Sequence, residues 1–197
     1  ISYWILIEFG DTALCIPSLY HGSQRCAGVR HGCSGIGAAR SGQIERARVE
    51  LARIKEFQAE LPASTLTYWR EQVKVHIDAL NAWVQMSEGK MDAAIKSAKA
   101  AADLEDSVDK HPVTPVEVLP ARELLADLLL EAGKSTNALV EYEAVLKNSL
   151  NRLNALVGAV EAAENSGQTQ LAASFRQTIR AQVNNASGPR AARLRAY

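Results

Sequence analysis

Residues 119–186 decide the fold, and they read LPARELLADLLLEAGKSTNALVEYEAVLKNSLNRLNALVGAVEAAENSGQTQLAASFRQTIRAQVNNA. The two halves of this stretch match at an interval of 34 residues, which separates Gly133 from Gly167 and Ala138 from Ala172. Alanine and leucine supply most of the apolar residues, and both favour helices. A glycine between two apolar helical segments predicts a helical hairpin whose turn is made by that glycine. The stretch therefore predicts two tandem helical hairpins.

The same glycine and alanine pair occurs twice more, upstream of this stretch. Gly42 precedes Ala47, and Gly89 precedes Ala94, by the same interval as in the tandem. We expect each glycine to supply a left-handed helix C-cap and each alanine to allow close packing of the second helix. The intervals between successive turn glycines are 47, 44 and 34 residues. The longer intervals predict insertions, one of which is the proline-rich loop at residues 109–120.

Length and composition limit the classes of protein to consider. A chain of 197 residues, of which 47% are hydrophobic, can form one domain or one short repeat array with a continuous core. The formal net charge is zero, which gives no reason to expect nucleic acid as a partner. No stretch is long and apolar enough to cross a bilayer, so we expect a soluble protein. The three cysteines have no zinc-binding spacing and are expected to be incidental.

Three parts of the chain differ in composition. Residues 1–33 are rich in Gly, Cys, Ser and His and lack a sustained helical period, so they are expected to form an irregular leader. Because the chain begins with Ile, this leader is expected to be truncated or non-native. Residues 34–183 form the predicted helical domain. Residues 184–197 contain three arginines and no acid, and are expected to form a basic, frayed tail.

The repeat resembles the tetratricopeptide family. Residues 120–152 match its pattern at Leu125, Gly133, Ala138 and Tyr142, and residues 153–186 match at Gly167 and Ala172. This resemblance implies an all-α, right-handed solenoid of helical hairpins. Residues 34–183 are also similar to the C-terminal part of bacterial tetratricopeptide proteins of unassigned function. That similarity implies a bacterial protein, in the cytoplasm or periplasm, and no particular activity.

The first helix of each hairpin is expected to line a concave face. Glu123, Asp127 and Glu131 recur every four residues and so share one side of their helix. His76, Trp83 and Glu161 occupy the equivalent side of neighbouring first helices. No lysine or arginine occurs on the predicted face, so we expect an acidic groove that binds a basic protein or peptide anchored on Trp83. The alternative is an ordinary solvated helix face.

A second hypothesis is a metal site at the junction of the loop with the third hairpin. His76, His111, Glu123 and Asp127 would suit Zn or another divalent ion if the loop folded over the groove. Such a site could activate water, which makes a metal-dependent hydrolase the alternative function. No HExxH spacing is present, and no other catalytic motif is complete, so a non-catalytic scaffold is expected. An uncovered end of the solenoid could also support homo-oligomerisation.

Overall fold

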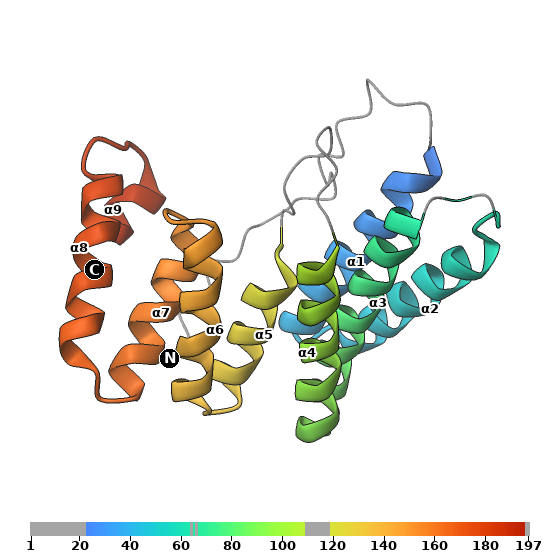
Figure 1. Cartoon of the computed structure of the whole chain (residues 1–197), viewed down its shortest axis with the longest axis horizontal. Coiled ribbons are helices and arrows are strands. Elements are labelled where there is room, and N and C mark those ends of the chain that lie inside the picture. Colours follow the sequence, from blue (N-terminus) through green and yellow to red (C-terminus); the bar gives the residue numbers. More distant parts are fainter. Residues whose placement is uncertain (1–22, 64, 66, 109–118, 196–197) are drawn as a thin grey trace.

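The computed structural model describes residues 23–63, 65, 67–108 and 119–195, and Figure 1 shows the whole chain. Within these residues the chain forms nine helices and no strand. The all-α prediction is therefore confirmed. The helices are α1 (Ser23–Arg40), α2 (Ile44–Glu60), α3 (Thr67–Ser87), α4 (Met91–Ser107), α5 (Ala121–Glu131), α6 (Ser135–Asn148), α7 (Leu153–Asn165), α8 (Thr169–Val183) and α9 (Pro189–Arg195).

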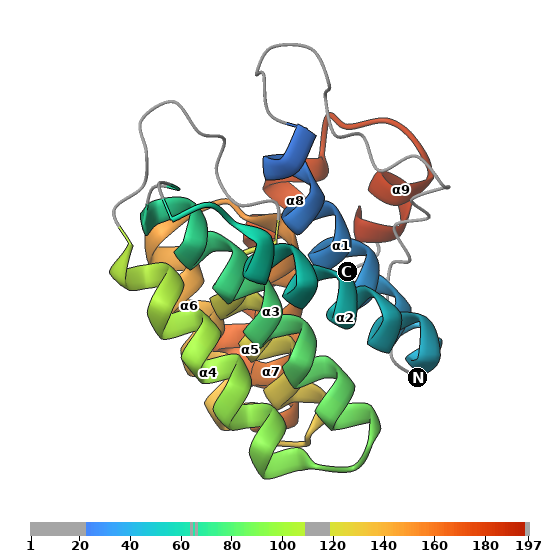
Figure 2. The same ribbon diagram turned by 90° about the vertical axis from the view of Figure 1, so that its right-hand side faces the viewer.

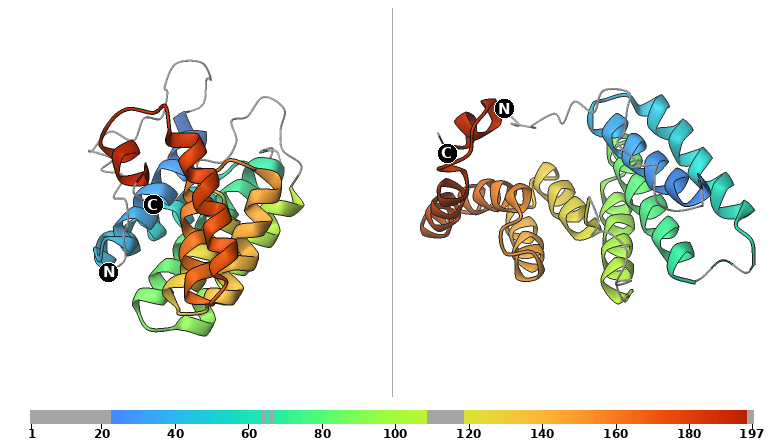
Figure 3. Two further views of the ribbon diagram at one scale, coloured as in Figure 1. Left: turned by 90° about the vertical axis from the view of Figure 1, so that its left-hand side faces the viewer. Right: turned by 90° about the horizontal axis from the view of Figure 1, so that it is seen from above.

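The first eight helices form four consecutive hairpins. Each odd-numbered helix packs against the helix that follows it, and each hairpin then packs against the next. A second set of contacts joins the first helices of the hairpins, α1 to α3, α3 to α5 and α5 to α7. Seen from above, the hairpins follow one another along the molecule from α1 and α2 to α8 (Figure 3). The odd-numbered helices therefore form one continuous layer, which contains every residue of the predicted concave face.

The four hairpin turns are built in the same way. Gly42, Gly89, Gly133 and Gly167 have φ angles of 78°, 76°, 72° and 78°, in the left-handed region that glycine adopts without a steric penalty. In each turn the next residue donates its backbone N–H to a carbonyl five residues earlier, as Lys134 does to Leu129 at 2.9 Å. This is the hydrogen bond of a Schellman C-cap. The prediction of four glycine-capped hairpins is confirmed.

The alanine that follows each turn glycine is fully buried. Ala47, Ala94, Ala138 and Ala172 each expose 0% of their surface. A methyl group at this position lets the second helix lie close to the first helix of its hairpin. The predicted role of these alanines is therefore confirmed.

The leader was expected to be irregular through residue 33, but α1 begins at Ser23. Three glycines of this helix, Gly28, Gly32 and Gly35, lie against the next helices. A Cβ at Gly32 would be 2.9 Å from His76 Cβ, and one at Gly35 would be 2.9 Å from Leu80 Cδ1. Glycine lowers helix propensity, so the local sequence predicted a loop. Close packing against α3 outweighs that preference; residues 1–22 lie outside the described part of the chain.

The tail was expected to be frayed, but it contains the short helix α9. Ala191 and Leu194 are buried, and α9 packs against α8. Helix α9 therefore covers part of α8 at the C-terminal end of the array, and the expected homo-oligomerisation through a solenoid end stays a prediction. Figure 2 views the opposite end of the molecule, formed by α1 to α4. No helix in the described residues is long and apolar enough to span a bilayer.

Candidate functional site

The three acids predicted to share a face come from α5, the central helix of the inner layer. They lie in different environments. Glu123 is buried, Asp127 is partly buried and Glu131 is exposed.

Glu123 is bound by an arginine from the connection between α6 and α7. Arg152, which directly precedes α7, donates two hydrogen bonds to the Glu123 carboxylate, one of them from Nη2 to Oε1 at 3.1 Å. The Glu123 side chain is only 5% exposed. Burial raises the pKa of Glu123, and the neighbouring Arg152 only partly offsets that effect. The residue links the third hairpin to the fourth and is not an open ligand for a partner.

Asp127 is bound from two sides. Arg40 Nη1, at the end of α1, donates a hydrogen bond to Asp127 Oδ2 at 2.8 Å, and Tyr142 Oη donates to Oδ1 at 2.6 Å. Burial raises the pKa of Asp127, against the lowering effects of Arg40 and Tyr142. Burial and the Asp127 charge also raise the pKa of the Tyr142 hydroxyl, which therefore stays a donor. These contacts connect the first hairpin directly to the third.

Trp83 belongs to the same cluster. The Arg40 guanidinium carbon lies 4.6 Å from the centroid of the Trp83 ring, close enough for a cation–π interaction. Trp83 is only 3% exposed, so it cannot anchor a partner while Arg40 covers it. The expectation that no arginine reaches this face is wrong. Arg40 and Arg152 come from elements that the face prediction left out.

Glu131 and Glu161 differ from Glu123 and Asp127 because no arginine is bound to their carboxylates by a hydrogen bond. Within the described residues neither forms a hydrogen bond or ion pair. Partial desolvation raises the pKa of Glu131, Arg40 lowers it, and the nearby charges of Asp127 and Glu161 raise it further. Glu131 is also the last residue of α5, where the helix dipole disfavours a negative charge. This pair is the part of the predicted acidic face that stays available to a partner.

The predicted metal ligands do not converge in the described residues. His76 packs against Gly32 of α1. Glu123 and Asp127, both on α5, are bound by Arg152 and Arg40. Among the residues that the structure describes, no three His, Cys, Asp or Glu side chains are grouped so as to hold a metal ion. His111 lies outside these residues, so the four-residue metal site stays a prediction.

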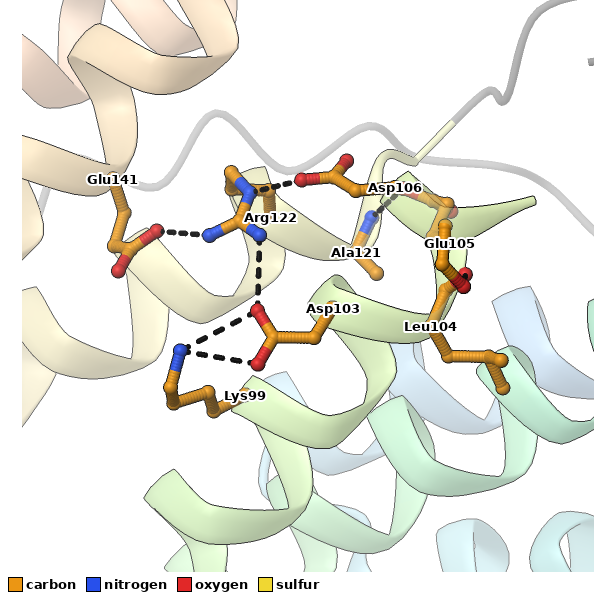
Figure 4. Close-up of polar contacts among 9 residues, drawn as sticks. Lys99, Asp103, Leu104, Glu105, Asp106, Ala121, Arg122 and Glu141 are labelled. Carbon is orange, nitrogen blue, oxygen red and sulfur yellow. Dashed lines mark hydrogen bonds and ion pairs between the residues drawn. The ribbon is translucent and has the colours of Figure 1, made fainter. Parts of the chain in front are cut away.

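A second polar cluster, which the sequence patterns did not predict, lies at the junction of α4 and α5 (Figure 4). Arg122 binds Asp106 at 2.6 Å, Asp103 at 3.1 Å and Glu141 at 2.5 Å. Burial disfavours the Arg122 charge, but these three carboxylates raise its pKa overall. Acids at the end of one helix and an arginine at the start of the next were visible in the sequence. Their pairing across the proline-rich loop required the fold.

Glu105 completes this junction. Glu105 is 6% exposed, and its carboxylate accepts the Ala121 backbone N–H at 2.7 Å. Pro120 occupies the N-cap position of α5 and has no side-chain oxygen, so Glu105 from α4 supplies the acceptor instead. The junction fixes the third hairpin against the second and has a structural role.

Comparisons with known proteins do not indicate a class for this protein, so the class follows from the fold alone. No family model matches the chain, and no curated protein or solved structure does either. The described residues define a class, an all-α protein of stacked helical hairpins.

Proposed function

We propose that the chain is a tetratricopeptide-like right-handed solenoid that binds a basic protein or peptide on its inner layer. The spacing of the turn glycines and the shared Schellman caps support the repeat interpretation. Stacked helical hairpins commonly present such a layer as a binding surface. The role is non-catalytic.

The observation that carries the partner chemistry is that Glu131 and Glu161 form no hydrogen bond or ion pair with a cation among the described residues. Desolvation, Asp127 and Glu161 together outweigh Arg40 and raise the pKa of Glu131, so a cation from a partner would stabilise its carboxylate. Most other acids of this region are already bound to arginine, as Glu123 is to Arg152 and Asp127 to Arg40. The pair therefore concentrates unbalanced charge at one place on the inner layer.

The test uses a defined probe, a phage library of random twelve-residue peptides selected on the purified chain. We expect lysine- and arginine-rich peptides to be enriched on the wild type. The Glu131→Gln/Glu161→Gln double variant should lose that enrichment, because it removes both charges and keeps the side-chain shapes.

Glu56→Gln/Glu60→Gln is the matched control. Both of these glutamates are exposed on α2, and the change in net charge is the same. This control should enrich the same basic peptides as the wild type. Equal loss in both double variants would show a general charge effect, and no enrichment of basic peptides on the wild type would refute the proposal.

A further inference from the structure

The Arg40 side chain occupies a site with well-defined chemistry. One edge of its guanidinium meets Asp127 at 2.8 Å, and its carbon lies 4.6 Å from the centroid of the Trp83 ring. Tyr142 binds the other Asp127 oxygen and so fixes the carboxylate. We name the place formed by Trp83, Asp127 and Tyr142 the guanidinium seat.

The seat is suited to arginine rather than lysine. A guanidinium is planar, so it can stack on an indole ring and donate in-plane hydrogen bonds to a carboxylate at the same time. An ammonium is more strongly hydrated and has no flat face to stack. The chain's own Arg40 therefore reveals the chemical class that the seat recognises.

Three features make Arg40 an exchangeable occupant. It is the last residue of α1, directly before the hairpin turn, so its side chain can turn toward solvent by rotation about its own bonds. The Arg40 and Asp127 side chains are 18% and 15% exposed, so the contact has an edge open to water. The seat also adjoins Glu131, whose charge interacts with both Arg40 and Asp127.

We propose that the guanidinium seat is a subsite for an arginine of the partner, and that Arg40 is an internal competitor for it. A basic peptide held by Glu131 and Glu161 would bring a second basic side chain next to the seat. Its arginine would replace Arg40 on Trp83 and Asp127. This inference rests on the proposed function for its partner, and it adds the residue type recognised and an autoinhibitory contact.

The first experiment needs no partner and uses N-ethylguanidinium as the probe. Arg40→Ala should melt at a lower temperature than the wild type. Millimolar N-ethylguanidinium, the concentration range expected for a small cation with few contacts, should restore part of the loss in a saturable way. If Arg40→Ala is unfolded at room temperature, the same compound should restore its helical circular dichroism.

Two controls isolate the seat. Ethylammonium at equal concentration should restore little, because it lacks the planar face. N-ethylguanidinium should not restore Arg40→Ala/Asp127→Asn, which lacks the carboxylate charge. Equal effects of both cations on Arg40→Ala, or no effect of either, would overturn the proposal.

The second experiment separates this inference from the proposed function. An arginine-containing peptide from the phage selection should bind Arg40→Ala about tenfold more tightly than the wild type. This is the factor expected when one hydrogen bond between charged groups forms without competition from Arg40. Its lysine analogue should show no such gain. Equal affinity for both proteins would overturn the competition while leaving the scaffold function standing. If no basic peptide bound either the wild type or Arg40→Ala, the scaffold function would be refuted. The proposed role of the seat in binding a partner would then be refuted as well.

Discussion

Gly158 of α7 allows the sharpest test of how the hairpins are held together. A Cβ at this position would lie 2.5 Å from Tyr142 Oη and equally close to Cε1 of the same ring. Tyr142 is 1% exposed and donates its hydroxyl hydrogen to Asp127, so burial and this hydrogen bond both restrict movement of the ring. Gly158→Ala therefore forces the ring to shift and stretches or breaks that hydrogen bond.

The expected change in the free energy of unfolding for Gly158→Ala is the sum of three contributions. Alanine in place of a helical glycine normally stabilises by roughly 0.5–1 kcal/mol. Overpacking a core costs about 1–3 kcal/mol. Loss of a hydrogen bond to a charged group costs about 1.5–3 kcal/mol. The net expectation is a loss of roughly 2–5 kcal/mol, which lowers the melting temperature by on the order of 10 °C in a domain of this size.

The assay is urea denaturation followed by circular dichroism at 222 nm. Gly37→Ala provides the control, because Gly37 is also helical and a Cβ there would meet nothing within 4 Å. We expect Gly37→Ala to stabilise by about 0.5–1 kcal/mol from helix propensity alone. A Gly158→Ala protein as stable as the wild type or more so would show that Tyr142 is not tightly confined, and would refute the packing argument.

The remaining predictions concern α1, the junction and the acidic pair. Gly35→Ala should lower the unfolding free energy by about 1–3 kcal/mol in urea denaturation, because its Cβ would meet side chains of α2 and α3. Glu105→Ala should cost about 1–3 kcal/mol in the same assay, since the Ala121 N–H loses its acceptor, whereas Glu105→Gln should retain most of the stability. The pKa of Glu131 is raised from its ordinary value of 4.5, so the folded state holds that proton more tightly than the unfolded state, and the resulting stability is lost as pH rises above 4.5. Glu131→Gln should therefore raise the melting temperature at pH 7 but not near pH 4; a similar gain from Glu56→Gln would contradict this reasoning.

Much of the fold could be predicted from local sequence signals. Gly133 and Gly167 mark hairpin turns because only glycine enters the left-handed region without a steric penalty, and the structure gives them φ angles of 72° and 78°. Ala138 and Ala172 mark close helix contacts because a methyl group fits where a larger side chain would not. Both signals depend only on residues close in sequence, so they can be recognised without the tertiary structure.

Helix α1 could not be predicted in the same way. Gly28, Gly32 and Gly35 weaken the helix as a local structure, so the sequence by itself predicts a loop through residue 33. In the folded chain the same glycines let α1 approach α3, and that packing supplies the stability that the helix lacks alone. Helix propensity alone predicts the wrong structure for α1, because tertiary contacts determine the structure of this segment.

Residues 119–186 show both what the local sequence determines and what only the tertiary contacts determine. By itself the sequence determined that the chain is helical, that glycines end the first helices, and that Glu123, Asp127 and Glu131 share a face. Only the tertiary structure decided which of these acids is bound by an arginine and which is not. Arg40 reaches Asp127 across 87 residues, and Arg152 reaches Glu123 across 29. Pairing over such separations depends on how the hairpins stack, and the period of a repeat carries no information about it.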